Sequence, residues 1–383
     1  MSRSNTIGTD RMSAGMQVVP VMVCFLITGL VPLAFVTEGY FEAIESGNLP
    51  LCSCLGAFGG VVFAASRMTA STRKHILVCA LFIVTAALMV PVFSETPLAM
   101  GCGAAMLGFG ASAAMTALVP LLASLSSPAG LAVRLACGAA CGTAVFLTMT
   151  HVAWWSETTA MPTFGLGWKV IFMLSAMLSL LALTMLAATP FDFRQEARQA
   201  TKRQFPVSEA VAMACVACIG FSLLQQSMTG QTAQPPALSR SMGLLSSLVG
   251  CLVAALSLRH LPSRFFPVFA SSLAVAGTLL VALCPSAEIT AVAGVFAGFA
   301  CPSLMAPIIA AGTRIEGVQR ADRTSSLLVG GMFAGMLPAT LHLGTPVASG
   351  IEICAAFYLL YYSIFRFSPE LPTDYKHSDT NRR

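Results

Sequence analysis

Long apolar blocks, separated by short polar turns, set the tightest limit on how this chain can fold. The block 98–122, for example, holds no charged residue. A helix of about 20 apolar residues crosses the hydrocarbon core of a bilayer, where only a helix or a closed barrel satisfies its backbone hydrogen bonds. Barrel strands would alternate apolar and polar residues over about 10 positions. These blocks do not alternate, so the pattern predicts membrane-spanning helices.

The composition fits the same interpretation. Of the 383 residues, 56% are hydrophobic and 10% are charged, whereas a soluble domain carries about 25% charged residues. The net charge of +5 does not indicate nucleic-acid binding, because the basic residues lie in small groups beside the apolar blocks. The thirteen cysteines are spread along the predicted helices and are typical of small buried hydrophobes rather than of a disulfide framework.

We interpret the apolar blocks as twelve spans. A cleaved signal peptide is the alternative for the first block, but its apolar stretch is longer than such peptides have. The expected spans are 16–36, 49–66, 76–93, 98–122, 131–150, 168–188, 208–228, 242–258, 267–284, 289–311, 325–343 and 348–367.

A polar segment, 189–206, divides the spans into two sets of six. It carries four basic residues, Arg194, Arg198, Lys202 and Arg203. We therefore expect a six-helix bundle at 1–188, a cytosolic basic linker at 189–206, a second six-helix bundle at 207–367 and a cytosolic tail at 368–383.

The distribution of charge orients the spans. Lys and Arg concentrate on the cytosolic side of membrane proteins. With twelve spans, all but two (Lys169 and Arg240) of the 21 Lys and Arg residues fall on the side of both termini. We expect a multi-pass protein of the inner or plasma membrane, with both termini in the cytosol. The acidic residues on or bordering the opposite side are Glu38, Glu42, Glu45, Glu95, Glu157, Glu288 and Glu352.

Three local motifs accompany this arrangement. The basic loop between spans two and three follows Gly60 and carries Arg67, Arg73 and Lys74. Span five contains a glycine-rich stretch at 138–142, and span six begins with the sequence GWKVIF at 167–172. Together with the six-plus-six pattern, these motifs resemble those of the major facilitator superfamily along nearly the whole chain.

Two departures from that family's pattern stand out. Ser66 occupies the position where the family's loop motif carries an aspartate, and span four lacks the arginine that drug–proton antiporters carry there. The resemblance implies an all-α integral membrane protein with twelve transmembrane helices in two pseudo-symmetric six-helix bundles. It also implies a central site near the midplane, lined by spans one, four, seven and ten, and a conformational role for Arg67, Arg73 and Lys74.

Polar residues within the cavity-lining spans are the candidate substrate ligands. Gln225 and Gln226 are adjacent amides in span seven, and an amide in hydrocarbon is costly unless it is hydrogen-bonded. The alternative is that span seven ends before them, at the interface. Thr28, Ser112 and Thr116 are further candidates, although such hydroxyls often bond to their own helix.

Four other residues have alternative interpretations. Arg134, at the inner end of span five, is either an anion ligand or an interfacial anchor. His342 could carry a coupling proton, since histidine titrates near neutrality, or it could be an interfacial histidine. Glu38 and Glu352 border the outer face and are the remaining coupling candidates.

Soft side chains raise a metal alternative. Met173 and Met177 are four residues apart, and Cys215 and Cys218 are three apart, so each pair shares a helix face. Thioether and thiolate ligands suit Cu(I), but helix packing explains the same pairs. We predict no metal site and no cofactor.

The sequence therefore predicts a secondary active transporter that exports a small organic solute by alternating access, with protons as the candidate coupling ion. The glycine-rich span five and the mostly apolar cavity favour export. The alternatives are an uptake permease for a nutrient or metal chelate, and a non-transporting sensor on a transporter scaffold. We expect a monomer in the lipid bilayer that binds no nucleic acid. An enzyme is disfavoured, because no buried carboxylate pair, histidine cluster or phosphate-binding loop is present.

Overall fold

Secondary structure in the part of the chain that the structure describes is entirely helical. This computed structural model describes residues 14–25, 49–69, 71–94, 96–126, 128–158, 169–189, 206–229, 236–260, 265–284, 286–316, 321–341 and 345–367. The helices in these ranges are α1 (Ala14–Cys24), α3 (Leu49–Arg67), α4 (Arg73–Phe93), α5 (Pro97–Ser124), α6 (Pro128–Thr158), α7 (Lys169–Ala188), α8 (Val207–Thr229), α9 (Pro236–His260), α10 (Phe265–Leu283), α11 (Ala287–Glu316), α12 (Ala321–Thr340) and α13 (Thr345–Phe367).

The helix α5 shows how the sequence builds these elements. Thr96 caps its first turn by accepting a hydrogen bond from the backbone N–H of Ala99 at 3.4 Å, and Pro97 occupies the first helical position. Its 28 residues extend roughly 42 Å at about 1.5 Å per residue. Within the described residues, eight helices are long and apolar enough to cross a membrane, and α5 is the most buried of them.

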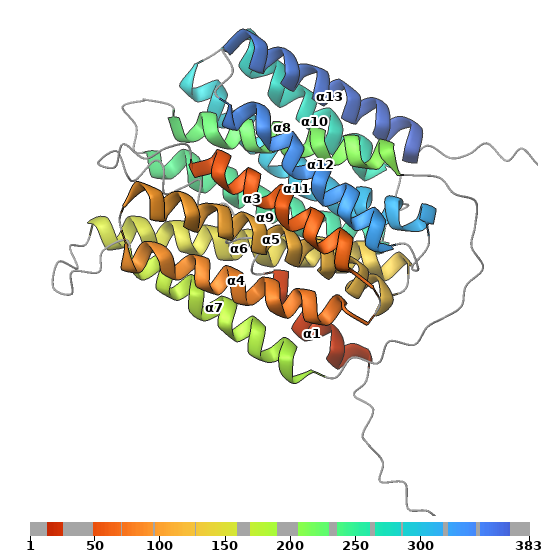
Figure 1. The fold of residues 1–383 in the computed structure, drawn as a ribbon. Coiled ribbons are helices and arrows are strands. Elements are labelled where there is room, and N and C mark those ends of the chain that lie inside the picture. Colours follow the sequence, from red (N-terminus) through yellow and green to blue (C-terminus); the bar gives the residue numbers. More distant parts are fainter. Residues whose placement is uncertain are drawn as a thin grey trace, which may run out of the picture.

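The helices pack in an order that repeats. In the first half of the chain, α3 packs on α5, α5 on α4, and α4 on α7 (Figure 1). In the second half, α9 packs on α11, α11 on α10, and α10 on α13. Each helix of the second series is the sixth after its counterpart in the first. This repeat confirms the predicted fold class of two pseudo-symmetric six-helix sets.

The contacts between the two halves repeat in the same way. The helix α12 packs on α3, and α6 packs on α9. A shift of six helices converts one pair into the other, as an approximate two-fold axis between the halves requires. Additional contacts join α12 to α5 and α11 to α6, so α12 and α6 are the helices that reach furthest into the other half.

Small residues allow helices of one half to approach closely. A Cβ atom built on Gly108 of α5 would collide with the backbone carbonyl of Ser53 in α3. Glycine at such positions lets two backbones meet in a membrane, where packing rather than hydrophobicity holds helices together.

The predicted spans coincide with helices, but several helices extend beyond the apolar blocks. The span expected at 131–150 lies within α6, which runs to Thr158, and the span expected at 242–258 lies within α9, which begins at Pro236. Backbone hydrogen bonds, not apolar side chains, propagate a helix, so hydropathy alone underestimates helix length. Of the first expected span, the structure describes only residues up to Phe25.

Candidate functional site

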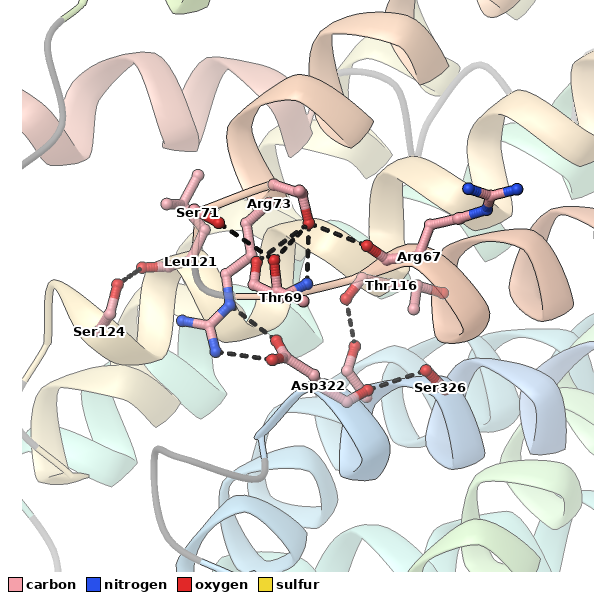
Figure 2. A network of polar contacts seen from close by, with 11 residues as sticks. Arg67, Thr69, Ser71, Arg73, Thr116, Leu121, Ser124, Asp322 and Ser326 are labelled. Atoms are coloured by element: carbon pink, nitrogen blue, oxygen red, sulfur yellow. Dashed lines mark hydrogen bonds and ion pairs between the residues drawn. The ribbon is translucent and has the colours of Figure 1, made fainter. Parts of the chain in front are cut away.

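An ion pair joins the two halves at the end of the bundle where α4 and α12 begin. Arg73 is the first residue of α4, and Asp322 lies in the first turn of α12. Arg73 Nε donates to Asp322 Oδ1 at 2.7 Å and Nη2 donates to Oδ2 at 2.8 Å (Figure 2). The two side chains are only 6% and 18% exposed. This is the two-pronged geometry in which a guanidinium binds a carboxylate most specifically.

A second contact lies one turn further along α12. Ser325 Oγ donates to the backbone carbonyl of Thr116 in α5 at 2.8 Å, and both residues are fully buried (Figure 2). The carbonyl of Thr116 would normally accept a bond from the N–H of residue 120. That residue is Pro120, which has no N–H, so the carbonyl is available to the other half. We call Arg73, Asp322, Thr116 and Ser325 the α12 latch.

The loop before α4 is held by hydroxyl groups. Thr72 Oγ1 donates to the carbonyl of Arg67 at 2.9 Å and accepts a bond from the N–H of Thr69 at 2.8 Å. The Arg67 side chain is exposed and does not take part in the latch. Of the three basic residues predicted to form a conformational loop, Arg73 reaches the other half through Asp322.

Lys74 contacts a different element. Its Nζ donates to the carbonyls of Ala187 and Thr189, at 3.1 Å and 2.7 Å, where α7 ends. A cation at a helix C-terminus satisfies terminal carbonyls and suits the helix dipole. At the start of α4, Arg73 therefore contacts α12 and the adjacent Lys74 contacts the end of α7.

The acidic partner of Arg73 is the residue of this site that the sequence did not reveal. Ser66, at the position of the family's aspartate, donates to the carbonyl of Phe63 in its own helix at 2.9 Å. The carboxylate that meets the basic loop comes instead from Asp322, 249 residues beyond Arg73. The available signal was an aspartate at the end of the segment TRIEGVQRADR (313–323), which is basic overall.

A second arginine–carboxylate pair lies within the second half. Arg366, near the end of α13, places Nε 3.2 Å from Oε1 of Glu209 in the first turn of α8. Glu209 is 1% exposed, and Ser208 Oγ donates to its other oxygen at 2.8 Å. This pair fastens α8 to α13 and does not cross between the halves.

Glu352 lies deeper than the sequence indicated. The helix α13 begins at Thr345 rather than at Ala348, so Glu352 is the eighth residue of the helix. The residue is 4% exposed, and Ser222 Oγ of α8 donates a hydrogen bond to its Oε1. A carboxyl group therefore lies inside the bundle, next to a helix that is a candidate to line the cavity.

Two predicted substrate ligands serve helix packing in this structure. Ser112 and Thr116 are both fully buried. Ser112 Oγ donates to the carbonyl of Ala57 in α3 at 2.8 Å, and Thr116 Oγ1 donates to the carbonyl of Ser112 at 2.8 Å. Their role in substrate binding stays a prediction.

Arg134 has a structural contact at the end of α5. Its Nη1 donates to the carbonyl of Leu125 at 2.8 Å and to Ser126 Oγ at 2.6 Å. These bonds satisfy groups at a helix C-terminus. An anion-binding role for Arg134 also stays a prediction.

Other predicted residues lie outside the described part of the structure. Gln225 and Gln226 belong to α8, which continues to Thr229 and so extends past both amides, but their side chains are not described. Thr28, Glu38 and His342 fall outside the described ranges altogether. Among the residues described, no cluster of three or more His, Cys, Asp or Glu side chains could hold a metal ion.

Comparison with known proteins yields a structural likeness only. No protein-family model matches the sequence, and no curated protein matches it. The structure of the transporter FucP in the outward conformation superimposes with a TM-score of 0.69 at 14% identity, over 93% of this chain and 99% of FucP. The structure of the proton:xylose symporter XylE superimposes with a TM-score of 0.70 at 10% identity, over 92% of this chain and 95% of XylE. The structure of the human organic anion transporter TETRAN superimposes with a TM-score of 0.65 at 12% identity, over 92% of this chain and 98% of TETRAN.

The apolar helices and these likenesses identify a multi-pass integral membrane protein. Its fold is the major facilitator fold, over more than nine tenths of the chain.

Proposed function

We propose that this protein is a secondary active transporter that moves a small organic solute by alternating access. The observation that carries the proposal is the α12 latch within a major facilitator fold. Its contacts join opposite halves at one end of the bundle. They are hydrogen bonds between side chains or from a side chain to a carbonyl, which can break and re-form as two rigid halves rock.

The proposed halves are residues 1–188 and 207–367, joined by the linker 189–206 and followed by the tail 368–383. The substrate site lies between them near the membrane midplane, as in transporters built from repeats. Gln225 and Gln226 are the first candidate ligands, with Thr28 as a further candidate. Ser112, Thr116 and Arg134 rank below them because each already has a partner in this structure.

The charge distribution favours a latch on the cytosolic side. Arg67, Arg73 and Lys74 lie at this end of the bundle, and positive charge concentrates in cytosolic loops. With this orientation, both termini are cytosolic, and a formed latch keeps the cavity closed to the cytosol. We propose a monomer in the inner or plasma membrane that carries out no catalytic step.

The proposed direction is export, on the strength of the glycine-rich stretch in α6 and the mostly apolar candidate cavity. Uptake is the second candidate, because two of the compared folds are those of proton symporters, FucP for fucose and XylE for xylose. The same vesicle experiment separates the two directions.

The test is transport of labelled solutes in membrane vesicles of both orientations, with and without a pH gradient. The panel contains amphipathic drugs, metal chelates, sugars and Cu(I). We expect gradient-driven movement of at least one organic solute, with the stronger accumulation in inside-out vesicles. Movement of no solute in either orientation would contradict the proposed function and favour the sensor alternative. Movement of Cu(I) alone would favour the metal alternative.

Gln225→Ala and Gln226→Ala form a matched pair for the substrate site. Adjacent helix positions point about 100° apart, so we expect one variant to lose transport while its neighbour retains it. Equal, full transport by both variants would remove these amides from the site and leave Thr28 as the next candidate.

A further inference from the structure

We propose that Glu352 of α13 is the residue that binds the coupling proton, and that Ser222 transmits its protonation state to α8. This inference rests on the transporter function proposed above and assigns the coupling step to one carboxyl group. In the family that the sequence resembles, α13 corresponds to span twelve, which is not among the cavity-lining spans. The proposed proton site therefore lies beside the cavity helices rather than on one of them.

Burial is the first observation behind this inference. Glu352 is 4% exposed and lies eight residues into α13, roughly 10 Å along the helix at about 1.5 Å per residue. Ionisable side chains within membrane spans are costly and are retained for function, including proton relays. A neutral residue at this position of α13 would pack at lower cost, so the burial of a carboxyl group here favours a functional role.

The second observation is the contact with α8. Ser222 Oγ donates to Glu352 Oε1, and a hydrogen bond to an ionised carboxylate is about twice as strong as one to a neutral group. Loss of the proton from Glu352 therefore tightens the link between α13 and α8, and protonation weakens it. Ser222 is three and four residues before Gln225 and Gln226, so all three lie on neighbouring positions of one helix surface.

Among the described residues of α8, α10 and α13, the titratable groups near Glu352 are thiols and phenols. On α8, the Cys218 thiol lies within electrostatic range of Glu352, with Cys215 one turn before it. The helix α10, which also packs on α13, contains no titratable residue between Phe265 and Leu283. On α13 itself, Cys354 is exposed, and Tyr358 lies further toward the latch end.

The proposed step transfers one proton and involves no oxidation. The Glu352 carboxylate takes a proton from water on one side of the membrane and becomes a neutral carboxyl group. After the two halves have rocked, the O–H bond of the Glu352 carboxyl group breaks, and the proton passes to water on the opposite side of the membrane. One proton crosses per cycle, and its binding is linked to the solute through Ser222 and the α8 surface.

The direct test is infrared difference spectroscopy of the full chain in liposomes as the pH is changed, with the proton as the only ligand. We expect a C=O stretching band of a protonated carboxyl group that disappears in Glu352→Gln and persists in the control Glu288→Gln, since Glu288 is exposed at the start of α11. In Ser222→Ala, which keeps the carboxyl group, the band should shift because the hydrogen bond from Ser222 is lost.

Three results would overturn the inference: survival of this particular band in Glu352→Gln, a wild-type spectrum that contains no band removed by Glu352→Gln, or a band in Ser222→Ala identical to that of the wild type. The Ser222→Ala comparison keeps the test decisive if Glu352→Gln fails to fold.

Transport supplies the second arm. For the solute moved by the wild type, Glu352→Gln should lose the stimulation by a pH gradient, while Glu288→Gln keeps it; retained stimulation in Glu352→Gln would contradict the inference. If the wild type moves no solute, the proposed function fails, whereas the infrared band still decides whether Glu352 binds a proton.

Discussion

The two contact surfaces of α12 differ in kind. Toward α8, in its own half, α12 presents Gly331 and Gly335, and a Cβ atom on either glycine would collide with the backbone carbonyl of Ala210 or Ala214. Toward the first half it presents Asp322 and Ser325, which form directed polar contacts with α4 and α5.

The difference indicates which contacts move. Backbone packing that leaves no space for a methyl group is lost if two helices slide, whereas an ion pair or hydrogen bond can be exchanged for water at modest cost. Where α12 faces α3, the nearest atom to a Cβ on Gly330 is Val61 Cγ1 at 3.7 Å, an ordinary van der Waals contact. We infer that α12 moves with α8 as one body and slides against α3 and α5.

The largest expected effect concerns the ion pair of the latch. Asp322→Asn leaves the buried Arg73 guanidinium without its countercharge, and breaking such a pair costs about 3 kcal/mol, or roughly a hundredfold in a conformational equilibrium. We expect faster hydrogen–deuterium exchange at the starts of α4 and α12, measured by mass spectrometry on the full chain.

Two further variants test whether the charges themselves are responsible. Arg323→Gln removes an exposed neighbouring charge and should leave exchange unchanged. The double variant Arg73→Asp with Asp322→Arg should restore much of the protection. If Asp322→Asn exchanges at the wild-type rate, the latch does not hold the two halves together.

The next effect, on stability, concerns the other surface of α12. Gly335→Ala places a methyl group against the carbonyl of Ala214, and overpacking of this kind costs about 2 kcal/mol. The thermal midpoint of the purified protein should fall clearly for Gly335→Ala and change little for Gly330→Ala, its matched control. Equal midpoints would mean that the two surfaces of α12 do not differ as described.

The sequence predicted one side of the latch but not the other. Apolar block length and the placement of Lys and Arg are local signals, and they predicted the helices and drew attention to Arg73. Its partner Asp322 could not be predicted, because the pairing depends on how α12 packs against the first half. The depth of Glu352 was underestimated, although Thr345 and Pro346 form a typical helix start. The available carbonyl of Thr116 likewise follows from Pro120 only once α5 is known to continue through that proline.

The smallest expected effect concerns the second contact of the latch. Ser325→Ala removes the donor to the carbonyl of Thr116 and leaves that buried carbonyl without this partner, at a cost of about 1 kcal/mol. Hydrogen–deuterium exchange in the first two turns of α12 should rise by less than in Asp322→Asn. A rise as large as that of Asp322→Asn would place the serine, not the ion pair, at the centre of the latch.

A double-mutant cycle with Pro120 tests why this carbonyl is available to α12. Pro120→Ala restores an N–H that can bond to the Thr116 carbonyl within α5. The carbonyl then has a partner in its own half, so Ser325→Ala should have a smaller effect in this background than in the wild type. If the two effects are equal, the proline does not prepare the carbonyl for the other half. If Ser325→Ala has a smaller effect in the Pro120→Ala background, the backbone hydrogen bond that Pro120 removes from α5 explains why the Thr116 carbonyl accepts a reversible bond from α12.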